Sequence, residues 1–184
     1  MRYFDLADDM TVPNRWHLGE LVHDGRDVSG ALWVGRRFEG ASPLDGKIDR
    51  PGKELDYCRT SFAVPVARAD LAEAIAAIAG PSCQRIPLKL PGHDGFDVLN
   101  SLRVVKCLDE HRSEFVKWTG EDHRADLAGQ YRMVTQLKIL SDQVPNDASF
   151  FRVEGWLIAL IVSEPVKVAM EEVGCVGATF VEVT

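Results

Sequence analysis

Hydrophobic residues are most concentrated in the last 35 residues of the chain, where their pattern predicts a strand, a helix and a second strand. Residues 156–162 carry almost no polar atoms, which is typical of a strand in the middle of a packed core. Ser163 suits the N-cap of a helix over residues 164–173, whose apolar positions recur on one helical face. Gly174 supplies the left-handed residue that ends a helix, and the second strand covers residues 178–183.

A second helix is predicted over residues 70–79, which are rich in alanine and carry one apolar face. Asp70 and Glu73 have the spacing of a capping box, with Asp70 as the cap. Gly80 and the proline after it end the helix. The small side chains predict that this helix lies close to a neighbouring sheet or helix.

The remaining apolar segments are short, and several alternate with polar residues, as strands do. The predicted strands cover residues 2–6, 31–35, 61–66, 84–90, 96–108, 115–119 and 131–139. Pro87 favours an edge position for its strand. In the last of these strands, Met133 is expected on the buried side. Strands in runs with two separated helices predict an α+β fold with mostly antiparallel sheets.

The 184 residues are expected to form a single domain, residues 1–184, which buries roughly 70% of its unfolded surface. Alternatively, residues 1–60 are expected to form a loosely attached N-terminal lobe of this domain. Residues 39–57 are polar and rich in glycine, proline and aspartate. A loop of this length is uncommon in a compact domain, so it is expected to be either a mobile or a functional arm.

The formal net charge of −7 argues against nucleic acid or an anionic membrane as the main partner and permits a basic one, although solubility alone also accounts for it. The four cysteines form no CxxC pair and are expected to be free thiols in a reducing compartment. The chain shows no secretion signal and no apolar run long enough for a membrane span. We therefore expect a cytoplasmic protein.

Sequence motifs for catalysis are missing. The five histidines form neither an HxxxH nor an HExxH pair, and no GxSxG elbow or glycine-rich phosphate loop occurs. We therefore predict no catalytic, cofactor-binding or metal-binding residue.

An acidic stretch over residues 109–126 is the most informative polar segment, because a tryptophan lies among its carboxylates. Such a stretch is typical of a binding rim that steers a basic partner toward an aromatic anchor, although two solvated loops would give the same pattern. The predicted partner-binding residues are Asp109, Glu110, Glu114, Trp118, Glu121 and Asp122.

Several segments together resemble an immunity-protein family of bacterial polymorphic toxin systems, immunity family eleven, earlier catalogued as a domain of unknown function. They are residues 15–19, residues 102–105, the pairs 109–110 and 113–114, residues 150–152, residues 160–164 and the ending 174–183. The resemblance covers nearly the whole chain. It implies a non-enzymatic protein that binds and occludes a cognate toxin, encoded by an adjacent gene, in the producing cell. It supplies no catalytic residues.

Two other functions fit the sequence. A small enzyme could use a histidine and carboxylates in residues 109–114, such as His111 with Glu114. An oligomerising scaffold could assemble through an exposed edge strand. The sequence leaves open the identity of the toxin, the interface and the oligomeric state.

Overall fold

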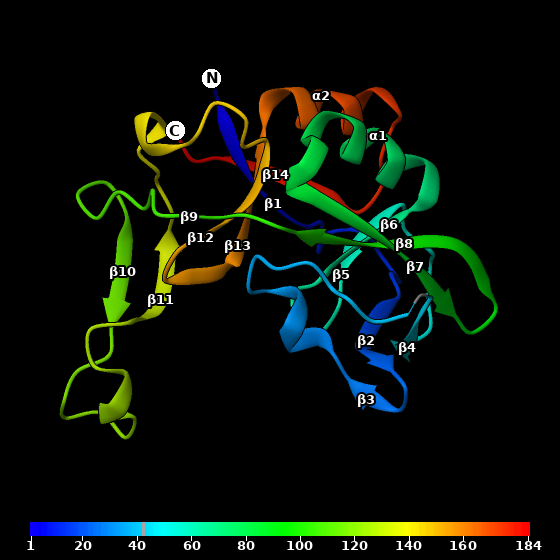
Figure 1. Ribbon diagram of the computed structural model, residues 1–184, viewed down its shortest axis with the longest axis horizontal. Helices are drawn as coiled ribbons and strands as arrows, with labels where there is room; N and C mark the ends of the chain where they lie inside the picture. The colour runs from blue at the N-terminus through cyan, green and yellow to red at the C-terminus, as the bar shows by residue number, and fades with distance from the viewer. Residues whose placement is uncertain (42) are drawn as a thin grey trace.

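The computed structural model describes residues 1–41 and 43–184, which fold into two large β-sheets, two α-helices and a projecting hairpin (Figure 1). The five-stranded sheet has the order β14-β1-β13-β12-β9, and only the β12–β9 pair is parallel. Its strands are β1 (Tyr3–Asp8), β9 (Val104–Val105), β12 (Phe150–Val153), β13 (Trp156–Ser163) and β14 (Ala178–Glu182). The predicted strand–helix–strand ending of the chain is confirmed.

The seven-stranded sheet has the order β3-β2-β4-β7-β8-β6-β5, and only the β4–β7 pair is parallel. Its strands are β2 (His17–His23), β3 (Arg26–Asp27), β4 (Leu44–Arg50), β5 (Tyr57–Arg59), β6 (Pro65–Arg68), β7 (Cys83–Leu90) and β8 (His93–Ser101). The first 60 residues thus contribute β1 to one sheet and β2 to β5 to the other.

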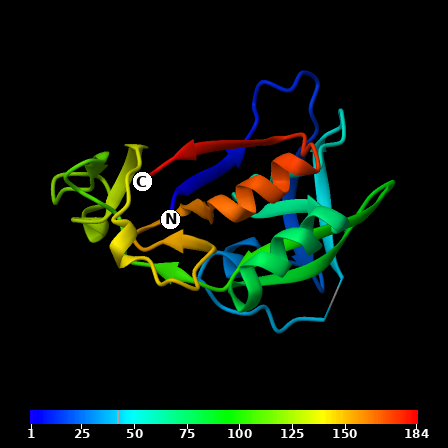
Figure 2. The same cartoon turned by 90° about the horizontal axis from the view of Figure 1, so that it is seen from above.

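Helices α1 (Ala69–Ala79) and α2 (Glu164–Glu172) pack against each other, α1 on β6, β7 and β8, and α2 on β1 and β13 (Figures 1 and 2). One core contains side chains from both helices and both sheets, including Leu71, Ile75, Val166 and Met170. The alanines of α1 permit this close approach. The predicted α+β fold is confirmed, and both helices lie within one residue of their predicted ranges. None of the described helices is long and apolar enough to cross a membrane.

The described residues also form four short 3-10 helices, at Ser29–Leu32, Gly80–Ser82, Ala125–Leu127 and Ser141–Gln143. The first replaces the strand predicted over residues 31–35, which was wrong. Leu32 is the apolar anchor of this turn, and Gly35, with a positive φ of 70°, ends the segment. The short apolar run of residues 31–34 therefore reflects one buried anchor, Leu32, and not a strand.

The predicted loop over residues 39–57 was wrong, because β4 occupies its middle; Ser42 lies outside the described residues. The sequence pattern did not indicate this strand, because Gly46 within it is neither a large apolar nor a β-branched residue. Glycine suits the close packing there, because a Cβ atom would come within 2.7 Å of the Leu90 side chain and displace it. The predicted edge position of Pro87 was also wrong: β7 is interior, but its ladder with β4 covers only Leu88 and Lys89.

The helix ends follow the predictions in part. Ser163 is the N-cap residue of α2, although its hydroxyl makes no capping hydrogen bond. Helix α1 begins at Ala69, so Asp70 lies in the first turn and the predicted capping box was wrong. Gly80 and Gly174 both have the positive φ expected where a helix ends.

A buried arginine connects the two sheets. The Arg152 side chain on β12 is fully buried, and it donates to the Leu157 carbonyl at 2.5 Å and to the Ala63 carbonyl at 3.1 Å. Ala63 lies between β5 and β6 of the other sheet. Burial, followed by the nearby Arg59 guanidinium, lowers the pKa of Arg152 to about 10. Burial also raises the pKa of Asp5, which lies 3.5 Å from Arg59. These charged groups couple the sheets at their junction.

Candidate protein-binding arm

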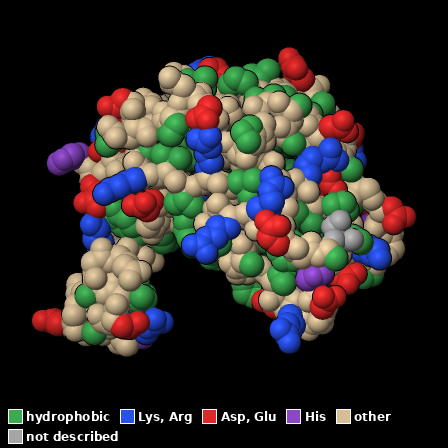
Figure 3. Space-filling view, in the orientation of Figure 1, with side chains coloured by type: hydrophobic (Ala, Val, Ile, Leu, Met, Phe, Trp, Pro, Cys, Tyr) green, Lys and Arg blue, Asp and Glu red, His purple; other side chains and the backbone are tan. Residues whose placement is uncertain are grey.

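A hairpin projects from the body of the protein, and we call residues 114–136 the arm. Strands β10 (Glu114–Lys117) and β11 (Tyr131–Gln136) form a separate two-stranded sheet. The space-filling view shows the arm standing clear of the body (Figures 1 and 3). No arm residue belongs to the three hydrophobic cores of the described chain. The arm therefore adds little to the packing of the body.

The two strands differ in regularity. Between Glu114 and Phe115, and again between Val116 and Lys117, the ladder shifts so that β11 carries one extra residue. Bulges of this kind make the outer edge of a strand a poor template for pairing. The outer edge of β10 is regular and lies on the side of the arm away from the body (Figure 1). It is unpaired among the described residues, and an extended segment of another protein could add to it.

One face of the arm is packed by its own side chains. The rings of Phe115 and Tyr131 meet edge to face at 5.2 Å, and the Lys117 ammonium lies 5.0–5.3 Å from both ring centres. Glu110 accepts hydrogen bonds from Lys117 at 2.6 Å and from the Tyr131 hydroxyl at 2.5 Å. Burial and the bond to Glu110 raise the pKa of Tyr131 to about 12. These contacts hold the hairpin in shape and connect it to Glu110 at its root.

The other notable feature of the arm is an uncovered apolar pair. Val116 and Met133 are directly opposite each other in the ladder, and 45% and 47% of their surfaces are exposed. The prediction that Met133 is buried was wrong, because the hairpin stands away from the body instead of lying on it. Large apolar side chains exposed together on a projecting element are typical of a protein-binding surface.

The tip of the arm is organised around Trp118. Its ring has the Arg132 guanidinium 4.8 Å from its centre and the His123 ring 5.2 Å away. Arg132 also pairs with Asp122 at 3.2 Å, and Asp122 accepts hydrogen bonds from the Thr119 backbone and hydroxyl. Arg132 and His123 therefore hold the Trp118 ring in place in this part of the arm.

Two cavities lie at the root of the arm. One, of about 250 Å³, is lined by Val134 and Leu137 on the arm side and by Trp156 and Val181 on the five-stranded sheet. The other, of about 310 Å³, is lined by Tyr131 and by residues of the body around Gly155. Val181 is 61% exposed. A partner bound to the arm could therefore place side chains in these two cavities.

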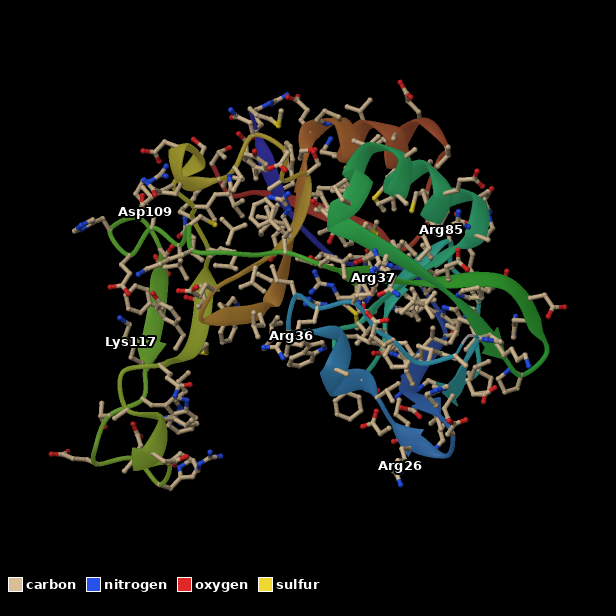
Figure 4. The ribbon with its side chains drawn as sticks, in the orientation of Figure 1. Arg26, Arg36, Arg37, Arg85, Asp109 and Lys117 are labelled. Carbon is tan, nitrogen blue, oxygen red and sulfur yellow. The ribbon has the colours of Figure 1, made fainter. Side chains whose placement is uncertain are left out.

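The structure brings all six predicted partner-binding residues into the arm or its root, but gives them different roles. Asp109 is buried at the root, where it pairs with Arg112 at 2.5 Å and accepts a hydrogen bond from the His111 N–H (Figure 4). Glu110 and Asp122 are paired as described above, and Trp118 is half-buried at the tip. Glu114 and Glu121 are exposed, and neither makes an ion pair within the described chain.

Most of the predicted acidic rim is therefore neutralised within the arm and its root. Sequence reasoning missed the Val116–Met133 pair, whose only signal was the alternation within two short strands. Nor does the structure bring His111 and Glu114 together: both are exposed, and no hydrogen bond between them occurs in the described chain.

Three lowered pKa values predict that the arm loosens in acid. The hydrogen bond from the Arg112 guanidinium lowers the pKa of Asp109, those from Lys117 and Tyr131 lower the pKa of Glu110, and those from Thr119 lower the pKa of Asp122. A carboxyl with a lowered folded-state pKa contributes stability above its unfolded value of about 4, and this contribution is lost as the pH falls through the folded value.

We therefore expect the amides of the arm to exchange hydrogen faster as the pH falls below about 4, before those of β13, after correction for the intrinsic rate. Exchange measured by NMR checks this. Arm amides that keep their protection until β13 unfolds would contradict it.

Replacing Trp118 tests whether it supports the fold. Its aromatic, cation–π and backbone contacts join it to arm residues. We expect Trp118→Ala to change the free energy of unfolding by about 0.5 kcal/mol or less. The matched control is Trp16→Ala, because Trp16 is fully buried in the core of the seven-stranded sheet, where the loss should be about 3–5 kcal/mol. Similar losses in chemical denaturation of both variants would show that Trp118 is a core residue.

A scan of the chain against models of known protein families finds no match, and a search of curated protein sequences finds none either. No group of three or more His, Cys, Asp or Glu side chains in residues 1–41 and 43–184 is placed to hold a metal ion.

Proposed function

We propose that the protein is an immunity protein that binds a cognate bacterial protein toxin and occludes its active surface, with the arm as the main contact element. The observation that carries this proposal is the projecting hairpin (Figure 3), which exposes Val116 and Met133 and carries Trp118 directly after β10. The resemblance to an immunity-protein family supports the same class of function. The toxin is expected to be encoded by an adjacent gene.

The arm has the composition of a compact binding site. Interfaces gain most of their affinity from a few aromatic and other large side chains at the centre of the contact, within a polar rim that excludes water. Val116 and Met133 would form the apolar centre, and Trp118 and Arg132 an aromatic–guanidinium pair beside it. The internal ion pairs of the arm keep these groups in one arrangement, which lowers the entropy lost on binding.

Electrostatic attraction acts at longer range in this proposal. Because the carboxylates at the arm are mostly paired, the arm itself offers few free negative charges. The net charge of −7 belongs to the whole chain and would speed the encounter with a basic toxin. Affinity would then depend on the apolar contact, and the association rate on salt concentration.

Co-expression tests the proposal directly. The toxin encoded beside this gene is produced in a host cell with and without the full-length protein, and survival and complex formation are measured. The proposal predicts protection of the host and recovery of a stable complex. Host cells killed equally in both cases, with no complex recovered, would contradict it.

A further inference from the structure

A basic cavity far from the arm has no role in the function proposed above. It has a volume of about 460 Å³ and lies beside the ends of β2 and β4. Its ionisable lining side chains are Arg15, His17 and Arg50, all of them basic, in a chain whose net charge is −7. This local concentration of basic side chains contrasts with the negative charge of the whole chain and is typical of a site for an anion.

The walls of this cavity are held by backbone contacts. The Trp16 N–H donates to the Lys53 carbonyl at 3.0 Å, and the Lys53 N–H donates to the Asn14 carbonyl at 2.6 Å. A Cβ atom at Gly52 would collide with the Asn14 carbonyl oxygen, so these two segments approach as closely as glycine permits. The cavity is therefore built into the fold and does not depend on loose side chains.

His17 and Arg50 make no ion pair with a carboxylate of the described fold. His17 and Arg50 are directly opposite each other in the β2–β4 ladder, and neither has a carboxylate within 4 Å in the described chain. Arg15 is only 5% exposed and is fixed by Asp8 at 3.3 Å and by the Asp9 carbonyl at 3.0 Å. An anion beside these two side chains would give them the hydrogen-bond partner that the described fold does not supply.

We propose that this cavity binds a small organic phosphate, with its phosphoryl group held by Arg50 and His17 against the fixed guanidinium of Arg15. Guanidinium groups match phosphate oxygens with paired hydrogen bonds. The volume lies in the range of about 300–1,000 Å³ that is usual for small-molecule sites, and it exceeds what a phosphate ion alone would fill. The organic part would lie against the apolar side chains of Met10 and Val12, which also line the cavity.

Calorimetric titration of the full-length protein tests the site, with adenosine monophosphate, inorganic phosphate and succinate as separate ligands at constant ionic strength. Saturable binding of adenosine monophosphate, tighter than that of inorganic phosphate and of succinate, is expected. No saturation with adenosine monophosphate, or equal affinity for the three ligands, would overturn the proposal. The titration contains no toxin, so its failure would leave the function proposed for the arm unaffected.

Matched variants then locate the site. Arg50→Gln and His17→Gln are each expected to weaken the binding of adenosine monophosphate about tenfold or more, since glutamine reproduces neither the paired N–H donors of the guanidinium nor the position of the imidazole ring. Arg26→Gln removes the same charge from β3, where Arg26 is exposed on the same sheet (Figure 4), and should leave the affinity unchanged. Equal weakening by Arg26→Gln and Arg50→Gln would show only general attraction by charge and would overturn the assignment.

Discussion

Replacing Arg152 with alanine is expected to lower the free energy of unfolding by about 3–5 kcal/mol. The side chain is fully buried between the two sheets, so its removal leaves a cavity. It also leaves the Leu157 and Ala63 carbonyls without their donor, at a cost of about 1–3 kcal/mol for each acceptor that stays dry. Chemical denaturation at neutral pH measures the loss.

A second variant separates volume from hydrogen bonding at this position. Arg152→Met keeps most of the volume but donates to neither carbonyl, so we expect a smaller loss of about 2 kcal/mol. Arg26→Ala, an exposed arginine on β3, serves as the control and should change stability by about 0.5 kcal/mol or less. If Arg152→Ala were as stable as the control, the buried arginine would not be what couples the two sheets.

Placing charges on the apolar pair of the arm is expected to abolish tight binding of the toxin. The double variant Val116→Asp, Met133→Asp would put two carboxylates at the centre of the proposed contact, opposite each other in the ladder. Hot-spot residues contribute about 2–4 kcal/mol each, so a loss of at least a hundredfold in affinity is expected. Calorimetry with purified toxin measures the affinity, and survival of the host cell gives an independent result.

The control for this variant lies on α2. Val168 is 41% exposed, and Val168→Asp adds a carboxylate to the surface at a site outside the arm. It is expected to bind the toxin as tightly as the unaltered protein. Because Val116 and Met133 lie outside the three cores, the double variant should also keep the melting temperature of the body. Full protection by the folded double variant would exclude the pair as the contact.

The sequence predicted the elements whose signal is local. Both helices were found because their apolar faces repeat over several turns and glycine ends each of them. The strand–helix–strand ending was found because residues 156–162 are apolar enough to indicate a central strand. By contrast, β4 was missed, because Gly46, which packs closely against Leu90, makes the segment look like a loop.

The candidate site was predicted in location more than in chemistry. The acidic and aromatic composition of residues 109–126 indicated the correct segment, since all six predicted residues lie in the arm or at its root. Two properties depend on tertiary structure and could not be predicted from the residues. Ion pairs within the arm and its root neutralise most of the carboxylates, and the projection of the hairpin exposes Met133, which alternation alone would bury.

Hydrogen–deuterium exchange of the protein, alone and in complex with its toxin, tests most directly whether the arm is the contact element. Amide protection gained in the complex is expected mainly in residues 114–136 and in the β14 residues beside the arm. Protection gained elsewhere on the body, with exchange of the arm unchanged, would contradict it.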